Sequence, residues 1–320
     1  MRVAVLGYGN IGKHAVDAVE FSPDMELAGI VELPERLQGP VPEVTGRKAL
    51  AASIGELQRV DVALLCIPSR SVPGVAPPIL ARGIHTVDSY DIHGQLADLR
   101  RSLDQAARGG DAVAVTGAGW DPGTDSIVRC MFEFMAPRGI TYTDFGPGMS
   151  MGHSVAARAV AGVADALAIT IPAGAGIHRR MVYVRLRPGS DFEDVAGRIK
   201  QDPYFAHDET IVRQVEDVTA LLDVGHGVSM ERKGVSGVTH NQRLHFSMKI
   251  NNPALTAQIM VASARAASRQ KPGAYTLIEI PVIDFMCGER EAIIRERVYP
   301  VPPRETDACA RVLSQRDPLF

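Results

Sequence analysis

The stretch Val3–Gly12, VAVLGYGNIG, decides the fold, because a short apolar strand runs directly into a glycine-rich turn and then into a helix. The strand covers Val3–Leu6, and the helix starts at about Asn10. Glycines in such a turn allow a tight bend, close approach of backbone to a pyrophosphate, and close packing of helix on strand, while the helix N-terminus faces the negative charge. The stretch predicts a dinucleotide-binding loop made of Gly7, Tyr8, Gly9, Asn10, Ile11 and Gly12.

An acidic residue, Glu32, follows the second predicted strand, Leu27–Val31, and lies 20 positions (32 − 12) beyond Gly12. A carboxylate there accepts hydrogen bonds from a ribose 2′-OH and repels a 2′-phosphate. Residue chemistry alone thus favours NAD over NADP as the cofactor. The alternative is that Glu32 points to solvent while Arg36 or Arg47 binds a 2′-phosphate. Three further residues are expected to contact the cofactor: Cys66, Pro68 and Ser69.

The first third of the chain alternates short apolar strands with helical segments, which is typical of a parallel sheet covered on both faces. It reads as a doubly wound α/β domain. The expected strands are Val3–Leu6, Leu27–Val31, Ala63–Ile67, His85–Val87 and Val113–Val115, with a further helix over Leu96–Arg108.

The pattern changes after Thr143, where Gly146–Gly148 breaks the chain and longer strands follow. These strands indicate an α+β domain with a mixed or antiparallel sheet. A last helix is expected over Pro253–Arg269, with Asn252 as its N-cap. The strands are expected at Ala166–Ile171, Met181–Arg187, Ile211–Val215 and Arg243–Ile250, with one helix over Phe192–Lys200.

Composition excludes several classes of protein. The 320 residues are 46% hydrophobic and 22% charged, which suffices for about two domains with buried cores. A net charge of -3 leaves no basic surplus for nucleic acid. No apolar stretch approaches the roughly 18 residues of a membrane helix, so a cytoplasmic protein is expected. The widely spaced Cys66, Cys130, Cys287 and Cys309 predict reduced, mostly buried thiols and neither disulfides nor a metal site.

Two carboxylates follow parallel strands at the edge where ligands of open α/β sheets bind. Asp91 and Asp121 are placed to hold a substrate ammonium, and Trp120 to exclude water as an apolar wall. Structural alternatives are that Asp121 caps the helix near Asp125 and that Asp88 caps a turn.

In the second domain, polar side chains at strand ends suit the head group of an amino acid, because the guanidinium of Arg can bind both oxygens of a carboxylate. They are Thr170, Arg180, His226 and Asn252.

Seven motifs in order, GYGNIG, TVDSYDIHG, AGWDPGTDSI, FGPGMSMGHS, DVGHGV, ERKGVSG and INNPALTAQ, closely resemble the meso-diaminopimelate dehydrogenase family over about residues 2–296. The chain resembles the shorter branch of that family, because no long insertion separates Pro172 from His178. The resemblance implies a homodimer. It also implies a dinucleotide-binding domain over 1–118, a substrate-binding and dimerisation domain over 119–250, a segment over 251–296 that returns to the first domain, and a tail of unknown role over 297–320.

The resemblance also assigns site residues. Asp91 and Asp121 would hold the ammonium of the D-centre beside the nicotinamide, Trp120 and Phe145 would line the site, and Met151 and Gly152 would cover the substrate. The positions expected to bind the distant L-centre are Thr170, Arg180, His226 and Asn252. The family usually uses NADP, with basic residues just past the second strand, whereas this sequence has Glu32-Leu33-Pro34 there.

The implied reaction is reversible oxidative deamination of the D-centre of meso-2,6-diaminopimelate, with hydride transfer to the nicotinamide and release of ammonia. The general base is either His153 or an ordered water. Two rival functions are an imine or aldehyde reductase of the same pathway and a non-catalytic dinucleotide-sensing protein.

Overall fold

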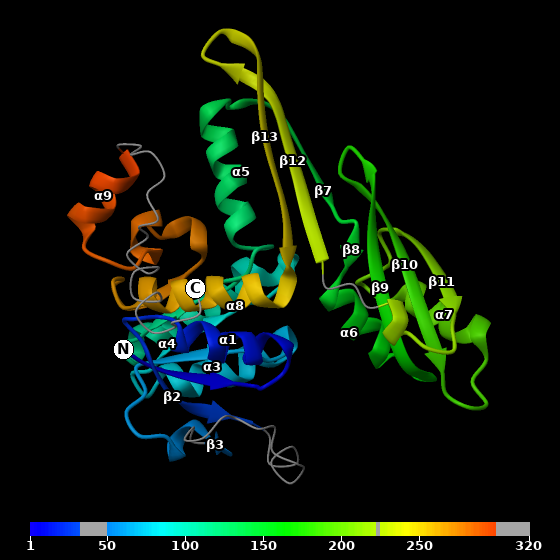
Figure 1. Cartoon of the computed structure of the whole chain (residues 1–320), viewed down its shortest axis with the longest axis horizontal. Helices are drawn as coiled ribbons and strands as arrows, with labels where there is room; N and C mark the ends of the chain where they lie inside the picture. Colours follow the sequence, from blue (N-terminus) through cyan, green and yellow to red (C-terminus); the bar gives the residue numbers. More distant parts are fainter. Residues whose placement is uncertain (33–49, 222–224, 299–320) are drawn as a thin grey trace, which may run out of the picture. The chain divides into compact units, whose positions relative to one another are not determined.

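The computed structural model describes residues 1–32, 50–221 and 225–298 of the chain (Figure 1). The chain divides into two compact units: Met1–Ile127 together with the described residues from Pro253 onward, and Val128–Asn252. The division lies inside helix α5 (Thr124–Met135), whereas the sequence analysis started the second domain at residue 119. Both expected sheet types are present, so the predicted fold class is confirmed.

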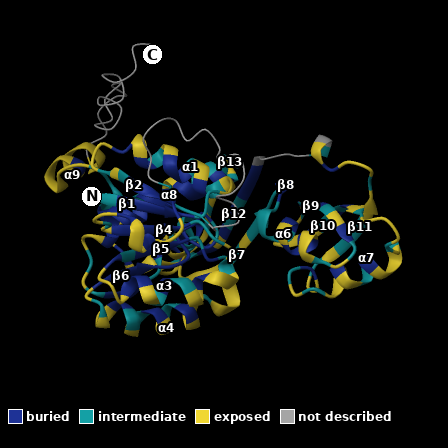
Figure 2. Ribbon diagram, turned by 90° about the horizontal axis from the view of Figure 1, so that it is seen from below, coloured by how far each residue is buried: buried dark blue, intermediate teal, exposed yellow. Residues whose placement is uncertain are grey.

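The first unit contains a seven-stranded sheet with the order β14-β6-β5-β4-β1-β2-β3, and every neighbouring pair is parallel. Figure 2 shows α1 and α8 on one face of the sheet and α3 and α4 on the other, which is the doubly wound arrangement. The strands are β1 (Arg2–Leu6), β2 (Glu26–Val31), β3 (Leu50–Ala51), β4 (Val62–Leu65), β5 (His85–Asp88), β6 (Val113–Val115) and β14 (Gly273–Tyr275). The helices are α1 (Asn10–Glu20), α3 (Val72–Leu80), α4 (Leu96–Gly109), α8 (Asn252–Ala267) and α9 (Arg290–Val298).

The expected elements of this unit are confirmed, with small shifts at their ends. β4 stops at Leu65, two residues before the expected end. α8 begins at Asn252 itself, so Asn252 is its first residue and not its N-cap. Helix α3 was not predicted, because Pro77 and Pro78 lie inside it. The helix forms in spite of these prolines because it packs against the sheet. Its buried residues are Val72, Ala76, Ile79 and Leu80.

The second unit contains two sheets. A four-stranded mixed sheet has the order β11-β10-β9-β8, and a three-stranded antiparallel sheet has the order β13-β12-β7. All four expected strands and the expected helix are present, and α5 is the helix mentioned near Asp125, while α6, β7, β8 and β12 were not predicted. The elements besides α5 are β7 (Arg138–Phe145), β8 (Gly148–Met149), α6 (Met151–Ala159), β9 (Val163–Gly174), β10 (Ile177–Leu186), α7 (Phe192–Gln201), β11 (Glu209–Gln214), β12 (Gly225–Ser236) and β13 (Thr239–Asn251).

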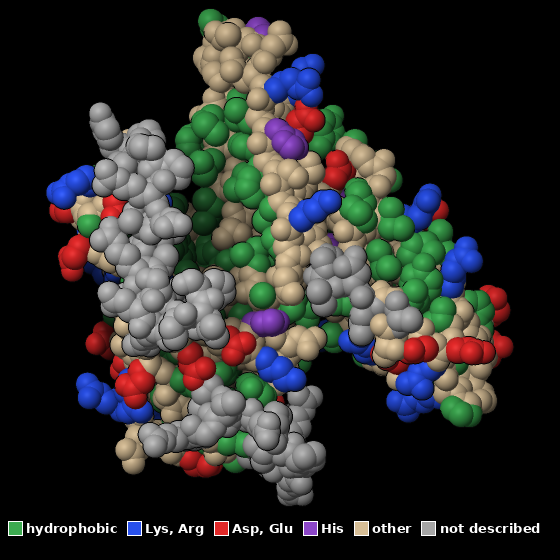
Figure 3. All heavy atoms as spheres, in the orientation of Figure 1, with side chains coloured by type: hydrophobic (Ala, Val, Ile, Leu, Met, Phe, Trp, Pro, Cys, Tyr) green, Lys and Arg blue, Asp and Glu red, His purple; other side chains and the backbone are tan. Residues whose placement is uncertain are grey.

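Arg232 ties the end of α5 to the three-stranded sheet. Its guanidinium is buried and donates to the carbonyl oxygens of Ala136 (2.7 Å) and Pro137 (3.2 Å). Beside it, α5 presents Met131, Phe134 and Met135 to solvent, with Phe134 72% exposed. Figure 3 shows apolar side chains gathered over this helix. We call these three residues the α5 apolar face.

The cysteine prediction is wrong for Cys130, which is exposed. It lies on α5, whose sequence does not show which face the sheet covers. Cys66 and Cys287 are half-buried, and Cys309 lies outside the described residues. Among the described residues, no helix is long and apolar enough to span a bilayer, and no three His, Cys, Asp or Glu side chains form a cluster suited to a metal ion.

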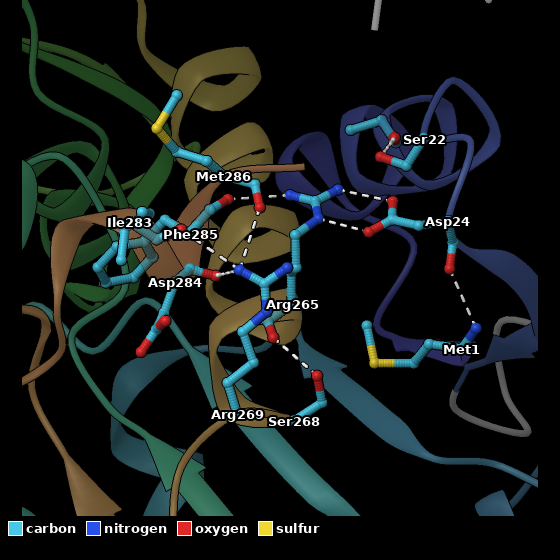
Figure 4. Close-up of polar contacts among 11 residues, drawn as sticks. Met1, Ser22, Asp24, Arg265, Ser268, Arg269, Ile283, Asp284, Phe285 and Met286 are labelled. Atoms are coloured by element: carbon cyan, nitrogen blue, oxygen red, sulfur yellow. Dashed lines mark hydrogen bonds and ion pairs between the residues drawn. The ribbon is translucent and has the colours of Figure 1, made fainter. Parts of the chain in front are cut away.

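Arg265 on α8 connects distant parts of the first unit (Figure 4). Its Nε and NH2 groups donate to both carboxylate oxygens of Asp24, at 2.5 and 2.8 Å, and NH1 donates to the carbonyl oxygen of Phe285 at 3.0 Å. The Arg265 side chain is only 8% exposed and that of Asp24 is 35% exposed. The hydrogen bond from Arg265 lowers the pKa of Asp24 below its ordinary value.

Replacing Asp24 by Asn should reduce the free energy of unfolding by about 1 to 3 kcal/mol at pH 7, because a nearly buried guanidinium loses its charged partner. Since the pKa of Asp24 is lowered on folding, the pair stabilises fully above the ordinary Asp pKa near 4, and this contribution is lost as pH falls below it. Urea unfolding from pH 7 to pH 3 measures it. Asp194→Asn, which breaks the exposed pair with Arg198, is the control and should change stability by at most about 0.5 kcal/mol. Equal losses in the two variants would contradict the assignment.

Candidate active site

The glycine-rich loop after β1 has the geometry of a phosphate cradle. Gly7 has φ +90°, and a Cβ there would lie 2.4 Å from the carbonyl oxygen of Cys66. A Cβ on Gly12 would lie 1.9 Å from the carbonyl oxygen of Gly7, so the helix can pack this closely only with glycine. At Gly9 a Cβ would meet nothing within 4 Å, and Gly9 caps α1 without any side-chain hydrogen bond. The open space and the helix N-terminus fit a dinucleotide pyrophosphate.

Glu32 belongs to this loop, because its Oε2 accepts a hydrogen bond from the backbone N–H of Tyr8 at 2.7 Å. The carboxylate therefore lies beside the cradle. Arg36 and Arg47, the alternative phosphate ligands, lie outside the described residues.

The segment after β4 brings an expected cofactor residue next to an expected catalytic one. Ser69 Oγ donates to Asp91 Oδ1 at 2.6 Å, and the backbone N–H of Asp91 donates to Ser69 Oγ at 3.1 Å. Pro68 precedes the short 3₁₀ turn that holds Ser69. Burial raises the pKa of the Cys66 thiol to about 12, so this thiol is neutral and packs as an apolar group.

Asp88, at the end of β5, is completely buried and holds two loops together. Its Oδ1 accepts hydrogen bonds from Thr116 Oγ1 (2.9 Å), Tyr90 N–H (3.0 Å) and Gly117 N–H (3.2 Å). Burial raises its pKa to about 6 even though these donors oppose the shift. The proposed turn cap is confirmed, and the carboxylate fixes the loop of Asp91 as well as the loop of Trp120 and Asp121.

Asp121 contacts a histidine, His93, that was not among the predicted site residues. Its Oδ1 lies 3.3 Å from His93 Nε2. Trp120 is buried at the same loop. The first N–H groups of α5 are bonded by backbone, since Thr124 donates to Gly119 O and Asp125 to Trp120 O.

In the second unit, Arg180 and Thr170 meet as expected. They are direct partners across β9 and β10, and Arg180 NH1 donates to Thr170 Oγ1. Arg180 Nε donates to Asp208 Oδ2 at 2.6 Å. Asp208 was not among the predicted site residues, and it lies just before β11, the strand parallel to β10. No sequence signal shows this pairing, because it depends on the register of two separate strands.

His153 lies near this pair and is a neutral imidazole. Its Nδ1 is 2.7 Å from Ser150 Oγ, and the rings of Tyr204 and Phe205 pack edge-on against it. Burial, reinforced by the charge of Arg180, lowers the pKa of His153 to about 3. An imidazole with so low a pKa is a weak proton acceptor at neutral pH, which argues against His153 as the general base.

The remaining expected residues lie in four places of the second unit. Phe145 ends β7, where its N–H donates to His178 Nε2 at 2.7 Å and its ring packs on the His178 ring. Met151 and Gly152 begin α6. His226 is buried on β12 opposite Ile250, and Asn252 is the last residue of the unit.

The expected site residues therefore form two groups, each within one unit. The first unit holds the cradle, Ser69, Asp91, Trp120 and Asp121. The second unit holds Phe145, Met151, Gly152, Thr170, Arg180, His226 and Asn252. The described contacts bring together Ser69 with Asp91 and Thr170 with Arg180.

Comparisons with known proteins agree on one family. The family model of the diaminopimelic acid dehydrogenase C-terminal domain matches residues 119–252. The meso-diaminopimelate D-dehydrogenase of Bacteroides fragilis is 56% identical over 91% of this chain and 97% of its own length. That of Corynebacterium glutamicum is 31% identical over 88% of this chain and 93% of its own length.

Solved structures show the same likeness. The C. glutamicum DAP dehydrogenase in complex with DAP superposes with a TM-score of 0.82 at 28% identity, over 92% of this chain and 98% of that one. An engineered D-amino acid dehydrogenase bound to NADP+ gives a TM-score of 0.82 at 27% identity, over 92% of this chain and 99% of that one. The chain belongs to the meso-diaminopimelate D-dehydrogenase family, a family of dinucleotide-dependent dehydrogenases.

Proposed function

We propose that this chain oxidises the D-centre of meso-2,6-diaminopimelate to L-2-amino-6-oxopimelate, and that it runs the reverse reductive amination. The substrate ammonium carbon gives up a hydride, a water oxygen replaces the nitrogen, ammonium leaves, and one further proton goes to solvent. The bound nicotinamide dinucleotide supplies the hydride acceptor. The chain supplies the binding groups and the proton path.

The observation that carries this proposal is the contact between Ser69 and Asp91 at the edge of the sheet that also bears the glycine cradle. β1, β4 and β5 are adjacent and parallel, so their carboxyl ends meet at one edge. A carboxylate held there by hydrogen bonds is suited to fix an ammonium group beside a nicotinamide. Membership of the family supports the same reading.

The chain's residues then have distinct tasks. Asp91 and Asp121 hold the reacting ammonium and take its proton, and Trp120 excludes water from that centre. Arg180, oriented by Asp208 and Thr170, binds the carboxylate of the distant L-centre as a charge-assisted pair. The other residues of the second unit that the family resemblance assigns to the substrate are Phe145, Met151, Gly152, His226 and Asn252.

The test of the function is the absorbance of reduced nicotinamide with meso-diaminopimelate and each cofactor. Reduction of the 2-oxo acid should require ammonia. An imine or aldehyde reductase would work without ammonia, and a dinucleotide-sensing protein would bind cofactor without turnover, so either result would overturn the proposal.

We also propose appreciable use of NAD besides NADP, since the Glu32 carboxylate lies at the cradle. The family's usual use of NADP argues against this proposal, and the negative charge of Glu32 argues for it. A carboxylate at this position repels a 2′-phosphate by electrostatics.

Changing Glu32→Arg should shift cofactor preference toward NADP by roughly 5- to 150-fold, or about 1 to 3 kcal/mol. Glu32→Gln keeps an oxygen for the Tyr8 N–H and should shift preference less, in the same direction. The ratio of kcat/KM for the two cofactors measures the shift. Glu20→Arg, an equal charge change at the far end of α1, is the control and should leave the ratio unchanged. If Glu32→Arg leaves the ratio of kcat/KM for the two cofactors unchanged, residues other than Glu32 recognise the 2′-phosphate.

Arg180→Met should lower kcat/KM for meso-diaminopimelate by about 10- to 150-fold, because a charge-assisted contact worth about 1.5 to 3 kcal/mol is lost. Turnover of D-alanine, which lacks the distant centre, should change little. Arg179→Met is the matched control: this neighbour projects to the opposite face of β10 and pairs with exposed Glu209. If the ratio of kcat/KM for meso-diaminopimelate to kcat/KM for D-alanine is unchanged in Arg180→Met, Arg180 does not bind the carboxylate of the L-centre.

We infer a homodimer that uses the α5 apolar face. Three large apolar side chains on one solvent-facing helix are typical of a protein interface. Phe134→Glu should convert dimer to monomer in light scattering at micromolar concentration, because an interface buries the new charge without a partner. Phe21→Glu, which changes an equally exposed phenylalanine of the first unit, should leave the mass unchanged. A dimer that survives Phe134→Glu would exclude this face.

A further inference from the structure

His93 connects the nearly buried Asp121 with solvent. Its Nε2 lies 3.3 Å from Asp121 Oδ1, and its side chain is 59% exposed, against 13% for Asp121. The imidazole also lines a cavity of about 560 Å³ within the first unit. We propose that His93 is a proton relay, which takes the proton that Asp121 receives from the substrate ammonium and passes it to solvent in this cavity. This inference rests on the proposed function.

The reaction requires such a path. Oxidation of an ammonium centre by a nicotinamide dinucleotide and water yields a carbonyl, ammonium, the reduced cofactor and one proton for each turnover. If Asp121 accepts the proton from the nitrogen, it becomes a carboxylic acid with little access to water. Transfer of this proton to His93 Nε2 restores the carboxylate, and the imidazolium then loses a proton to water.

The geometry holds the two relay partners in place. The backbone N–H of His93 donates to the Asp91 carbonyl oxygen at 3.1 Å, which folds the loop back after β5. Asp88 bonds to Tyr90 in this loop and to Gly117 in the loop that leads to Asp121. The same buried carboxylate thus connects the two loops that carry His93 and Asp121.

Charges around His93 favour its protonation. The hydrogen bond with Asp121 raises its pKa above the ordinary value, and Asp121, Asp125 and Asp91 add by their negative charge, while burial opposes. Arg100, Arg101 and Glu279 line the same cavity. Arg100 pairs with Glu279 and Arg101 with Asp98, so both guanidinium charges are balanced.

The sign of the pH effect follows from these charges. Only neutral His93 can accept a proton, so oxidation should accelerate as pH rises through its raised pKa. Reductive amination consumes a proton and should slow over the same range.

The first test compares His93→Gln with the unmodified chain in the oxidation of meso-diaminopimelate. The variant should lose about tenfold or more in kcat near pH 7, with KM for the substrate changed less than about twofold, and the alkaline rise of kcat should disappear. In His93→Ala, whose short side chain leaves the space of the ring empty beside the cavity, free imidazole should restore kcat in proportion to its neutral form. His240→Gln, an exposed histidine of the second unit, is the control and should behave as the unmodified chain. An unchanged kcat, or a loss that imidazole does not rescue, overturns the relay.

A second test needs no turnover and separates the relay from the proposed function. The ring C–H signals of His93 in proton NMR should titrate above the ordinary histidine pKa, and Asp121→Asn should lower that midpoint. A His93 midpoint insensitive to Asp121→Asn overturns the relay even in an active enzyme. Lack of meso-diaminopimelate oxidation in the unmodified chain would instead overturn the proposed function.

Discussion

The fully buried carboxylate of Asp88 is the constraint on which the first half of the site depends. Three donors from two loops converge on its Oδ1, and these loops carry Asp91, His93, Trp120 and Asp121. A buried carboxylate is costly unless hydrogen bonds compensate for lost hydration, which is why this residue can tolerate few arrangements of its neighbours. Its pKa, which burial raises to about 6, reflects the lost hydration of the carboxylate. The fold thus uses one desolvated acid to position the two that remain available to substrate.

In the second unit, hydrogen bonds from neighbouring side chains hold a charged guanidinium in place. Arg180 is held at Nε by Asp208 and at NH1 by Thr170, so its orientation is fixed before any carboxylate binds. A preorganised guanidinium loses less side-chain entropy on binding than a free one. The nearby His153 stays neutral because burial and the charge of Arg180 both disfavour its protonated form. The neutral ring therefore adds no second positive charge to compete for a substrate carboxylate.

The sequence predicted the doubly wound sheet and the strand positions well, because period and turn chemistry are local. It failed where packing decides. α3 contains Pro77 and Pro78, yet its apolar residues are buried against the sheet. Cys130 was expected inside and is exposed, since nothing local shows which side of α5 meets the sheet. The site residues were named from strand ends and family motifs, whereas His93 and Asp208 were missed as partners because each acts through a contact between separate segments.

The cofactor cradle can be predicted from local sequence, because the tasks of Gly7, Gly9 and Gly12 follow from backbone geometry within one turn and depend on the lack of a Cβ. The sequence also determined which acids and bases stand at the strand ends. Their protonation states and their partners depend on how the chain packs. Asp88, Asp91 and Asp121 are the same residue type, but Asp88 is buried among donors, Asp91 bonds to Ser69, and Asp121 faces His93. Burial and charge depend on groups distant along the chain, so protonation and role are set by packing and not by residue identity.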